Sequence, residues 1–394
     1  MPRSPSVRLL FLSQRVPFPP NRGDKITTWR LVERLARHHE VTVMAFAHDE
    51  GDEQGAEALR AKGFETITVP LDLRRQKFRS LPTLLTRTPM TLAVYGSNAM
   101  QAAVDEKMKT MDGAYAYSSS MGAFLLGQDK PWAMHFAELD SDKWLQYADR
   151  HRWPQSAVYR REWRLLEQFE SQVADATIQN VFCTPLEQSI FQDRIPGHPS
   201  MVLRNGVDLE HFSPRPSEAE PEHLVFTGVM DYFPNIDGCI HFVKEVLPRV
   251  WAEFPGVRLS IVGSRPSKKI LRLGATDGVE VTGFVDSTAD WMARASIGVA
   301  PLRVGRGIQN KVLEAMAMGL PVVGTTSATQ GVAAIHGRHY LVADRAEEQA
   351  HAIRGLLRDP EARTRLGLAA RRFVEENHAW ESVFAPLDDL FPEA

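Results

Sequence analysis

The sequence has little cysteine and no long apolar run, and each absence excludes a class of protein. Its only two cysteines, Cys183 and Cys239, lie far apart among 394 residues. They cannot build a disulfide framework or a cysteine-rich zinc site, which favours a reducing compartment. No stretch reaches the roughly 18 consecutive apolar residues of a membrane span, and no small-residue cleavage site follows the short apolar run near the N-terminus. We therefore expect a cytoplasmic protein.

Charge of one sign is also scarce. The 46 Lys and Arg nearly balance the 49 Asp and Glu, for a formal net charge of −3. A dedicated nucleic-acid-binding protein is normally strongly basic, so we expect no nucleic-acid partner. Apolar residues make up 43% and charged residues 24%, which is typical of soluble globular proteins. At about 150 residues per domain, the chain is long enough for two or three domains.

Short apolar runs alternate with helical patterns along the whole chain. Candidate strands in the first half are Val7–Ser13, Val41–Phe46, Thr66–Val69, Ala114–Tyr117, Trp132–Phe136 and Ala176–Phe182. Those in the second half are Leu224–Thr227, Leu259–Val262, Val279–Thr282, Ile297–Ala300, Val322–Val323 and Tyr340–Val342. Helical patterns lie between them, for example at Lys25–Arg37 and Gln155–Val173. This alternation predicts an α/β protein with two doubly wound, Rossmann-like domains facing across a cleft, with ligands beyond the carboxyl ends of the strands.

The two halves meet at a turn-forming sequence. The stretch Asn205–Asp208 (NGVD) is followed by the polar, proline-containing stretch Ser213–Pro221. We assign residues 1–204 to an N-terminal domain and residues 205–375 to a C-terminal domain. Residues 376–394 are expected to form a C-terminal helix that packs back towards the N-terminal domain.

The segment 303–323 carries the clearest chemical signal. A strand ends just before it, a glycine-containing loop follows, and a short helix begins near Gln309 or Asn310. The free N–H groups and partial positive charge of a helix N-terminus suit a diphosphate, and Lys311 adds a full charge there. Glu314, one turn later, is placed to accept hydrogen bonds from two ribose hydroxyls, at about 1.5–3 kcal/mol for a charged acceptor. The alternative is that Asn310 caps an ordinary helix and Glu314 is solvated.

These residues match a known pattern. The stretch Lys311–Val323 (KVLEAMAMGLPVV) resembles the donor-site signature of family 4 glycosyltransferases, which have the two-domain GT-B fold. More narrowly, four segments together resemble the sugar transferases associated with exosortase/PEP-CTERM exopolysaccharide systems: Pro17–Lys25, Leu139–Ala148, Phe226–Gly238 and Arg306–Val323. The resemblance implies retention of configuration at the anomeric carbon and no obligatory metal or other cofactor. It also implies that the C-terminal domain holds most of a nucleotide-diphosphate sugar, while the N-terminal domain faces the acceptor.

The same resemblance assigns roles to single residues. Glu314 would bind the ribose, Lys311 would face the diphosphate, and Gly228 would let the backbone approach the donor. Arg306 stands where many members have a second glutamate, so its contact with sugar or with phosphate stays open. Asn235 stands approximately where many members have a lysine, so the positive charge near the phosphates would come from Lys311 and the arginines of the donor segment. The predicted donor site comprises Gly23, Gly228, Asn235, Arg303, Arg306, Gly307, Asn310, Lys311 and Glu314.

Two loops of the N-terminal half are further parts of the predicted site. Gly23 lies at a strand-to-helix turn, where glycine permits close approach of a ligand; the alternative is a proline-rich turn with Asp24 as the helix N-cap. Asp140 follows another strand and is our candidate on the catalytic face. Asp140 and Asp142 also have the form of an Asp-x-Asp metal motif, but the two parallel-sheet halves and the separate donor signature argue against metal binding. His135 is explained equally well as a packed core histidine or as a residue near the sugar.

A basic segment in the N-terminal half places five cations among apolar residues between Arg74 and Arg87 (RRQKFRSLPTLLTR). Basic amphipathic segments favour anionic membrane surfaces, at ~1 kcal/mol for each Lys or Arg close to the surface. Peripheral contact with the inner face of the plasma membrane is therefore an additional expectation, and a lipid-linked acceptor would explain it. A solvated basic loop is the alternative, and Pro82 prevents one long helix.

The sequence as a whole favours a metal-independent, retaining glycosyltransferase of the hexosyltransferase type. It would move a sugar from a nucleotide-diphosphate donor to a saccharide or polyprenyl-linked acceptor, in exopolysaccharide or cell-surface glycan synthesis. Asp140 and Lys311 are the predicted catalytic residues. Two alternatives remain, a nucleotide-sugar 2-epimerase and a non-catalytic nucleotide-sugar-binding scaffold.

Overall fold

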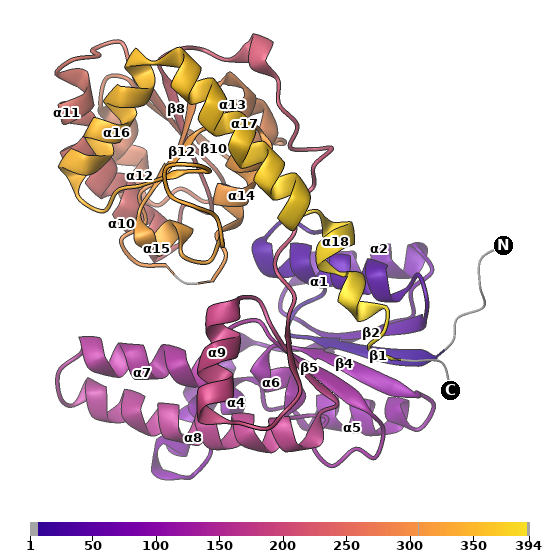
Figure 1. Ribbon diagram of the computed structural model, residues 1–394. Helices are drawn as coiled ribbons and strands as arrows, with labels where there is room; N and C mark the ends of the chain where they lie inside the picture. The colour runs from indigo at the N-terminus through magenta and orange to yellow at the C-terminus, as the bar shows by residue number, and fades with distance from the viewer. Residues whose placement is uncertain (1–6, 306, 392–394) are drawn as a thin grey trace. The chain divides into compact units, whose positions relative to one another are not determined.

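The chain folds into two compact units (Figure 1). The computed structural model describes residues 7–305 and 307–391, so the predicted donor residue Arg306 lies outside the described residues. The first unit comprises Met1–Arg204 and Phe384–Ala394, and the second comprises Asn205–Val383. The chain therefore passes between the units at the turn-forming sequence that begins at Asn205, and each unit is described by itself.

The first unit contains a seven-stranded sheet in which every neighbouring pair is parallel. Its strand order is β3-β2-β1-β4-β5-β6-β7, so the direction of winding reverses between β1 and β4. Ligands bind at such a reversal in doubly wound sheets, beyond the carboxyl ends of the strands. The strands are β1 Arg8–Ser13, β2 Glu40–Ala47, β3 Thr66–Pro70, β4 Gly113–Tyr117, β5 Trp132–Phe136, β6 Gln179–Phe182 and β7 Ser200–Val202.

Helices cover both faces of this sheet, with α1 and α2 on one face and α5 on the other (Figure 1). Alternate residues of β1 point to opposite faces, and Leu10 and Leu12 share one core cluster with Met100 and Val104 of α5. The helices are α1 Gly23–Leu35, α2 Glu50–Ala61, α3 Leu73–Ser80, η1 Leu81–Leu85, α4 Met90–Tyr95, α5 Asn98–Met108, α6 Ser119–Gly122, α7 Asp140–Arg150, α8 Gln155–Ala176, α9 Pro185–Arg194 and η5 Ala385–Leu387.

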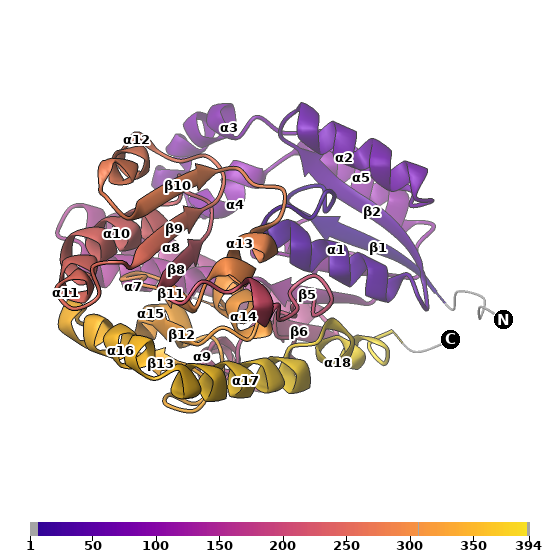
Figure 2. The same cartoon turned by 90° about the horizontal axis from the view of Figure 1, so that it is seen from above.

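The second unit contains a six-stranded parallel sheet of order β10-β9-β8-β11-β12-β13, with its reversal between β8 and β11. Its strands are β8 His223–Thr227, β9 Arg258–Val262, β10 Val279–Gly283, β11 Ile297–Ala300, β12 Val322–Gly324 and β13 Leu341–Val342. Its helices are η2 Pro216–Glu218, α10 Phe233–His241, η3 Phe242–Val246, α11 Leu247–Trp251, α12 Lys268–Leu271, η4 Arg272–Ala275, α13 Thr288–Arg294, α14 Asn310–Ala317, α15 Thr326–Thr329, α16 Ala346–Arg358, α17 Pro360–Asn377 and α18 Trp380–Val383. Within this unit α16 and α17 lie side by side, with α16 against α11 and α17 against α14 (Figure 2).

The fold class predicted from the alternation of strands and helices is confirmed, and the differences lie at element ends. Helix α8 continues to Ala176, so the strand predicted from that residue begins only at Gln179. The short, half-buried edge strand β7 was not predicted, because its three residues, Ser200–Val202, carry no clear apolar run.

Residues 376–391 do not form the single helix suggested by the sequence. Helix α17 ends at Asn377 because the chain then bridges to Val207, whose N–H donates to His378 O at 2.8 Å. The short helices α18 and η5 follow. In the first unit, Asp388 accepts a hydrogen bond from Arg34 Nε of α1 at 2.8 Å, and Phe391 is buried. The last described residues are thus held by α1 and the first sheet.

The C-terminal end of α14 is fixed by one arginine of α17. Arg371 is 16% exposed at its side chain, and it donates hydrogen bonds to the carbonyl oxygens of Ala317, Phe212 and Leu209 at 2.7, 2.6 and 3.3 Å. Ala317 is the last residue of α14. Arg371 therefore satisfies the carbonyl end of this helix and joins it to the start of the second unit.

We predict that Arg371→Ala lowers the free energy of unfolding by about 2 kcal/mol, because partly buried carbonyl oxygens lose charged donors. Thermal or denaturant unfolding of the purified chain measures the change. The neighbouring Arg372 is exposed and serves as the matched control, so Arg372→Ala should stay close to wild type. Equal effects of the two substitutions would contradict the bracing role of Arg371.

Candidate functional site

The predicted donor residues lie where β8 and α14 meet in the second unit. Helix α14 begins at Asn310, and its N-cap is Gln309, so Asn310 is not the cap that the simpler alternative required. Asn310 Oδ1 instead accepts a hydrogen bond from Asn205 Nδ2 at 3.0 Å. The first turn thus presents Asn310 and Lys311, with the positive end of the helix dipole behind them.

Lys311 reaches from α14 to the carboxyl end of β8. Its Nζ donates to Asn235 Oδ1 at 2.5 Å, and the Asn235 amide in turn donates to Val229 O at 2.8 Å. The ammonium also lies 4.4 Å from the centre of the Phe226 ring. Asn235 is 4% exposed. The structure therefore brings the predicted residues Lys311 and Asn235 together, and it pairs a cation with a neutral amide.

The charges at this point are destabilised by burial. Burial lowers the pKa of Lys311 to about 8, although Glu314 acts in the opposite direction. Burial likewise raises the pKa of Glu314 to about 7, against the effect of Lys311. A half-buried ammonium whose hydrogen-bond acceptor is an amide carries a desolvation cost that an incoming anion would offset. The simple alternative of a solvated Glu314 is wrong, because its side chain is partly buried.

Gly228 is required by close packing at the same point. A Cβ on Gly228 would lie 2.7 Å from Asn235 Nδ2 and 3.0 Å from Lys311 Nζ. On the other side, a Cβ on Gly263 would lie 1.7 Å from Gly228 O. The two glycines let the turns after β8 and β9 touch, and they leave the space that Lys311 and Asn235 occupy.

The loop between β11 and α14 is tied to the segment after β12. Gln330 Nε2 donates to Gly305 O at 3.0 Å, and a Cβ on Gly331 would lie 2.1 Å from Gly307 O. Gly307 has a φ of 61°, in the left-handed region that favours glycine. Arg303 binds the Asp237 carboxylate, with Nε 2.8 Å from Oδ2, and this contact lowers the pKa of Asp237. Arg303 is thus hydrogen-bonded to a carboxylate, whereas the hydrogen-bond acceptor of Lys311 is a neutral amide.

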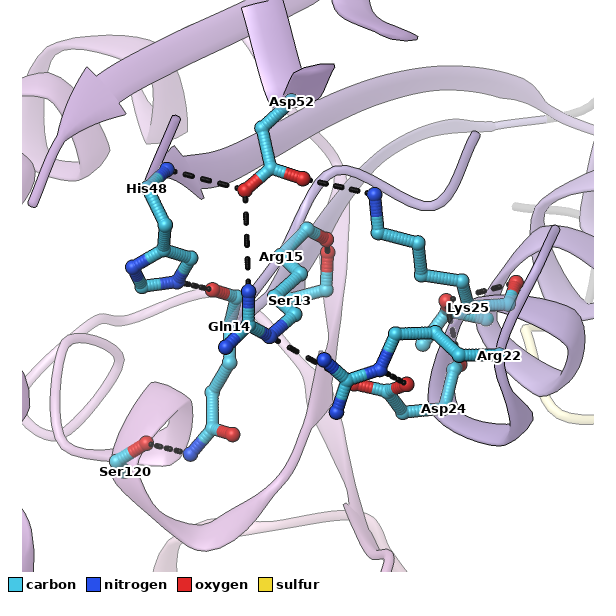
Figure 3. Close-up of polar contacts among 10 residues, drawn as sticks. Ser13, Gln14, Arg15, Arg22, Asp24, Lys25, His48, Asp52 and Ser120 are labelled. Atoms are coloured by element: carbon cyan, nitrogen blue, oxygen red, sulfur yellow. Dashed lines mark hydrogen bonds and ion pairs between the residues drawn. The ribbon is translucent and has the colours of Figure 1, made fainter. Parts of the chain in front are cut away.

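A separate group of predicted residues lies in the first unit, at the carboxyl edge of its sheet (Figure 3). Helix α1 begins at Gly23 and its N-cap is Arg22, so the alternative with Asp24 as N-cap is wrong. Asp24 instead accepts a hydrogen bond from Arg22 Nε at 2.5 Å. Figure 3 shows the Arg15 guanidinium between the carboxylates of Asp24 and Asp52, at 3.9 and 4.0 Å.

Sequence reasoning missed a buried ion pair and a polar network at this edge. Lys25 Nζ lies 2.7 Å from Asp52 Oδ1, and both side chains are buried. Burial raises the pKa of Asp52, but the hydrogen bonds from Lys25 and from the His48 N–H outweigh it and lower the pKa. The His48 ring lies 2.8 Å from Gln14 O, and the Gln14 side chain donates to Ser120 Oγ at 2.7 Å. The one sequence feature that could have indicated a partner for Lys25 is its place in the first turn of α1, since that position normally disfavours a cation.

Asp140 begins α7 after the short loop that follows β5, and it is buried. Its Oδ1 lies 2.5 Å from Lys143 Nζ, which also lies 3.2 Å from Glu138 Oε2. Burial lowers the pKa of Lys143, but these two carboxylates outweigh it and raise the pKa. Asp142 pairs with Arg194 at 2.8 Å, so the two aspartates of the Asp-x-Asp sequence bind different cations. Among residues 7–305 and 307–391, no group of three or more His, Cys, Asp or Glu side chains is placed to hold a metal ion.

His135 is a core residue. It lies within β5 and is 0% exposed, with Nδ1 2.8 Å from the Tyr115 hydroxyl and Nε2 3.4 Å from Cys183 Sγ. Burial lowers the pKa of His135 to about 3, so the ring is neutral. Of the two interpretations of this histidine, the structure supports the packed one.

The predicted residues therefore fall into two sets, each at the carboxyl edge of its own sheet. Gly23 and Asp140 belong to the first unit, and Gly228, Asn235 and Lys311 belong to the second. Arg303, Gly307, Asn310 and Glu314 also lie in the second unit, on α14 and the loop before it.

Sequence comparison identifies a matching protein family and several curated relatives. Residues 221–359 match the model of the family described as glycosyl transferases group 1. A GDP-mannose-dependent monoacylated alpha-(1-6)-phosphatidylinositol monomannoside mannosyltransferase of Corynebacterium glutamicum is 29% identical over 213 residues, covering 48% of this chain and 56% of that protein. A glycogen synthase of Mycobacterium tuberculosis is 27% identical over 193 residues, covering 46% of this chain and 45% of that protein. The chain thus spans about half the length of these curated relatives.

Solved structures match over almost the whole chain. Sucrose-phosphate synthase from Thermosynechococcus elongatus aligns with a TM-score of 0.71 and 19% identity, covering 98% of both chains. Anabaena HepE in complex with UDP aligns with a TM-score of 0.70 and 14% identity, covering 97% of this chain and 98% of that one.

At these identities the structural likeness shows the fold alone. The fold is that of GT-B glycosyltransferases, with two parallel-sheet α/β units, as predicted. At the level of sequence, residues 221–359 of the second unit are similar to the glycosyl transferases group 1 family.

We predict that Gly228→Ala abolishes nucleotide binding and leaves the fold intact. The new methyl group would lie against Asn235 and Lys311 and displace the ammonium from its position. Thermal-shift titration with uridine and guanosine diphosphates measures the loss, and circular dichroism checks the fold. Gly274→Ala is the matched control, because its Cβ would meet Val281 only at an ordinary 3.6 Å. Normal nucleotide binding by Gly228→Ala would exclude the β8–α14 junction as the site.

Proposed function

We propose that the protein is a retaining glycosyltransferase that moves a sugar from a nucleotide-diphosphate donor to a saccharide or polyprenyl-linked acceptor. The single observation that carries the proposal is the half-buried ammonium of Lys311, held on the neutral amide of Asn235 at the N-terminus of α14. The group 1 family match covers this junction and supports the donor side. A role in exopolysaccharide or cell-surface glycan synthesis, and membership of family 4, rest on the sequence resemblance.

The donor would be held by its nucleotide end. The β-phosphate would take the place of the Asn235 amide as the acceptor for Lys311, and the N–H groups of the first turn of α14 would bind the remaining phosphate oxygens. Glu314 would accept hydrogen bonds from the ribose hydroxyls, one turn along the helix. Replacing an amide as the acceptor for Lys311 would cost less free energy than replacing a carboxylate, which explains why Asn235 suits this position.

Leaving-group stabilisation would supply most of the catalysis. The bond between the anomeric carbon and the diphosphate oxygen breaks, and the diphosphate leaves with the electron pair. The acceptor hydroxyl oxygen bonds to the same carbon from the same face, and its proton passes to the departing diphosphate. Lys311 and the helix N–H groups stabilise the charge that develops on the leaving oxygen. Asp140 is the candidate on the acceptor side, and the step uses only residues of this chain without a metal.

Relatives indicate which donors to try first. The named mannosyltransferase uses GDP-mannose, and HepE structures contain UDP or UDP-glucose. Uridine and guanosine diphosphate sugars are therefore the first donors for this protein. The family match and the named relatives favour transfer over the 2-epimerase and scaffold alternatives.

We predict that Lys311→Met and Glu314→Gln weaken ligand binding in different ways. Lys311→Met should weaken the binding of both inorganic diphosphate and nucleoside diphosphates by about 10- to 100-fold, the loss of one charge-assisted hydrogen bond. Glu314→Gln should weaken nucleoside diphosphates alone, because inorganic diphosphate has no ribose. Calorimetric titration of both ligands measures the difference, and Lys244→Met, at an exposed lysine of η3, is the control.

The melting temperature separates a binding role from a structural one. The pKa of Lys311 in the folded chain, about 8, lies below its ordinary value, so the charged form costs stability at neutral pH. Lys311→Met should therefore melt no lower than wild type. A large loss of stability with unchanged diphosphate binding would sink the donor-site assignment, as would full transfer activity in both variants.

A further inference from the structure

The chain between β3 and β4 leaves the first sheet and carries large apolar side chains into solvent. Phe78 is 76% exposed, Leu81 is 50% exposed and Leu85 is 94% exposed. Five exposed cations lie among and beside them: Arg74, Arg75, Lys77, Arg79 and Arg87. Single exposed apolar residues are ordinary, but three within eight residues, interleaved with cations, form an amphipathic surface. We call the residues from Asp72 to Arg87 the basic–apolar segment.

The basic–apolar segment is held by side-chain contacts, so its apolar groups are presented on a fixed backbone. Asp72 Oδ1 accepts hydrogen bonds from the N–H groups of Arg74 and Arg75 at 2.9 and 3.1 Å, which caps α3. Arg161 of α8 donates to the carbonyl oxygens of Thr83 and Thr88 at 2.5 and 3.2 Å. These contacts position the backbone, while Phe78, Leu81 and Leu85 stay at least half exposed.

The same support carries one more exposed aromatic residue. Trp153 is 81% exposed and lies between α7 and α8, which pack side by side (Figure 1). It lies two residues before Gln155, where α8, the helix that carries Arg161 further along, begins. Tryptophan is enriched where proteins meet the headgroup region of a bilayer.

After the basic–apolar segment, helix α4 brings the chain back to the carboxyl edge of the first sheet. Helix α4 ends at Tyr95, whose ring centre lies 6.2 Å from that of Phe46 on β2. Burial raises the pKa of the Tyr95 hydroxyl, and the charges of Arg15 and Asp140 also act on it. One continuous stretch of chain therefore links the exposed amphipathic surface to the edge where Asp140 lies.

We propose that the basic–apolar segment docks on an anionic lipid bilayer, and that the acceptor is an amphiphile whose polar head reaches the sheet edge beside Tyr95. The docking stands on the surface itself, whereas the acceptor class rests on the proposed transferase function. An acidic protein would satisfy the cations alone. The exposed Phe78, Leu81 and Leu85 require an apolar phase, which a bilayer supplies directly behind its anionic headgroups.

Vesicle binding by the full chain tests the docking surface. Wild type should sediment with phosphatidylglycerol-containing vesicles and not with pure phosphatidylcholine vesicles, and high salt should weaken the binding. Phe78→Glu with Leu85→Glu, and separately Lys77→Glu with Arg79→Glu, should each lower the partition by about tenfold or more. The matched controls are Leu186→Glu, at a leucine 61% exposed on α9, and Lys268→Glu with Lys269→Glu on α12. Equal binding to both vesicle types, no binding, or equal losses in the controls would overturn the proposal.

Transfer into lipid tests the acceptor class. Radiolabelled UDP- and GDP-sugars, supplied with vesicles of bacterial lipid extract, should label the organic phase, and Tyr95→Ala should reduce the label without reducing vesicle binding. Label found only in water-soluble product would overturn the amphiphilic acceptor. Nucleotide thermal shifts measured without vesicles should be unchanged in all docking variants. If nucleotides do not raise the melting temperature of wild type, the transferase function is contradicted. Vesicle binding reports on docking alone.

Discussion

One contact defines the predicted donor site of the second unit: the ammonium of Lys311 on the amide oxygen of Asn235. It exists because glycines at 228 and 263 let two turns approach closely, which leaves room for a side chain from α14. Arg371 fixes the far end of the same helix through backbone carbonyl oxygens. Fixed groups at both ends mean that the ammonium needs little rearrangement to meet a diphosphate, which is the condition for electrostatic catalysis. Under the proposed function, the desolvation cost of Lys311 would be the consequence of a site that is built before its ligand arrives.

Much of the fold could be predicted because parallel strands are buried on both faces. Their apolar runs are visible without alternation, and β1, β8 and β11 all follow from them. The sequence also predicts an anion-binding role for the segment around Lys311, since a lysine in the first turn of a helix opposes the helix dipole unless an anion is near. No comparable signal marks the edge strand Ser200–Val202. An edge strand is hydrogen-bonded to a neighbour on one side only, and it needs only one apolar face.

The contacts between distant residues could not be predicted. Lys25 and Asp52 form a buried pair across 27 positions of the chain, and only the packing of α1 beside α2 brings them together. Asn235 was identified by its place in a motif, but that it would hold Lys311 depends on how α10 and α14 converge. His135 shows the converse case, since a polar residue in a buried strand has several chemical uses until its neighbours are known. Sequence patterns give local structure and charge, whereas pairing is a property of the packed fold.

Proton exchange with the buffer is the most direct measurement of the central claim. Lys311 has a pKa of about 8 in the free protein, and an adjacent diphosphate should raise that pKa. At a pH of about 8.5, binding of uridine or guanosine diphosphate should therefore take up a substantial fraction of one proton. Calorimetric titration in two buffers of different ionisation enthalpy measures this uptake. We expect different heats in the two buffers for wild type and equal heats for Lys311→Met. Binding without proton uptake in wild type, or the same uptake in Lys311→Met, would contradict the account.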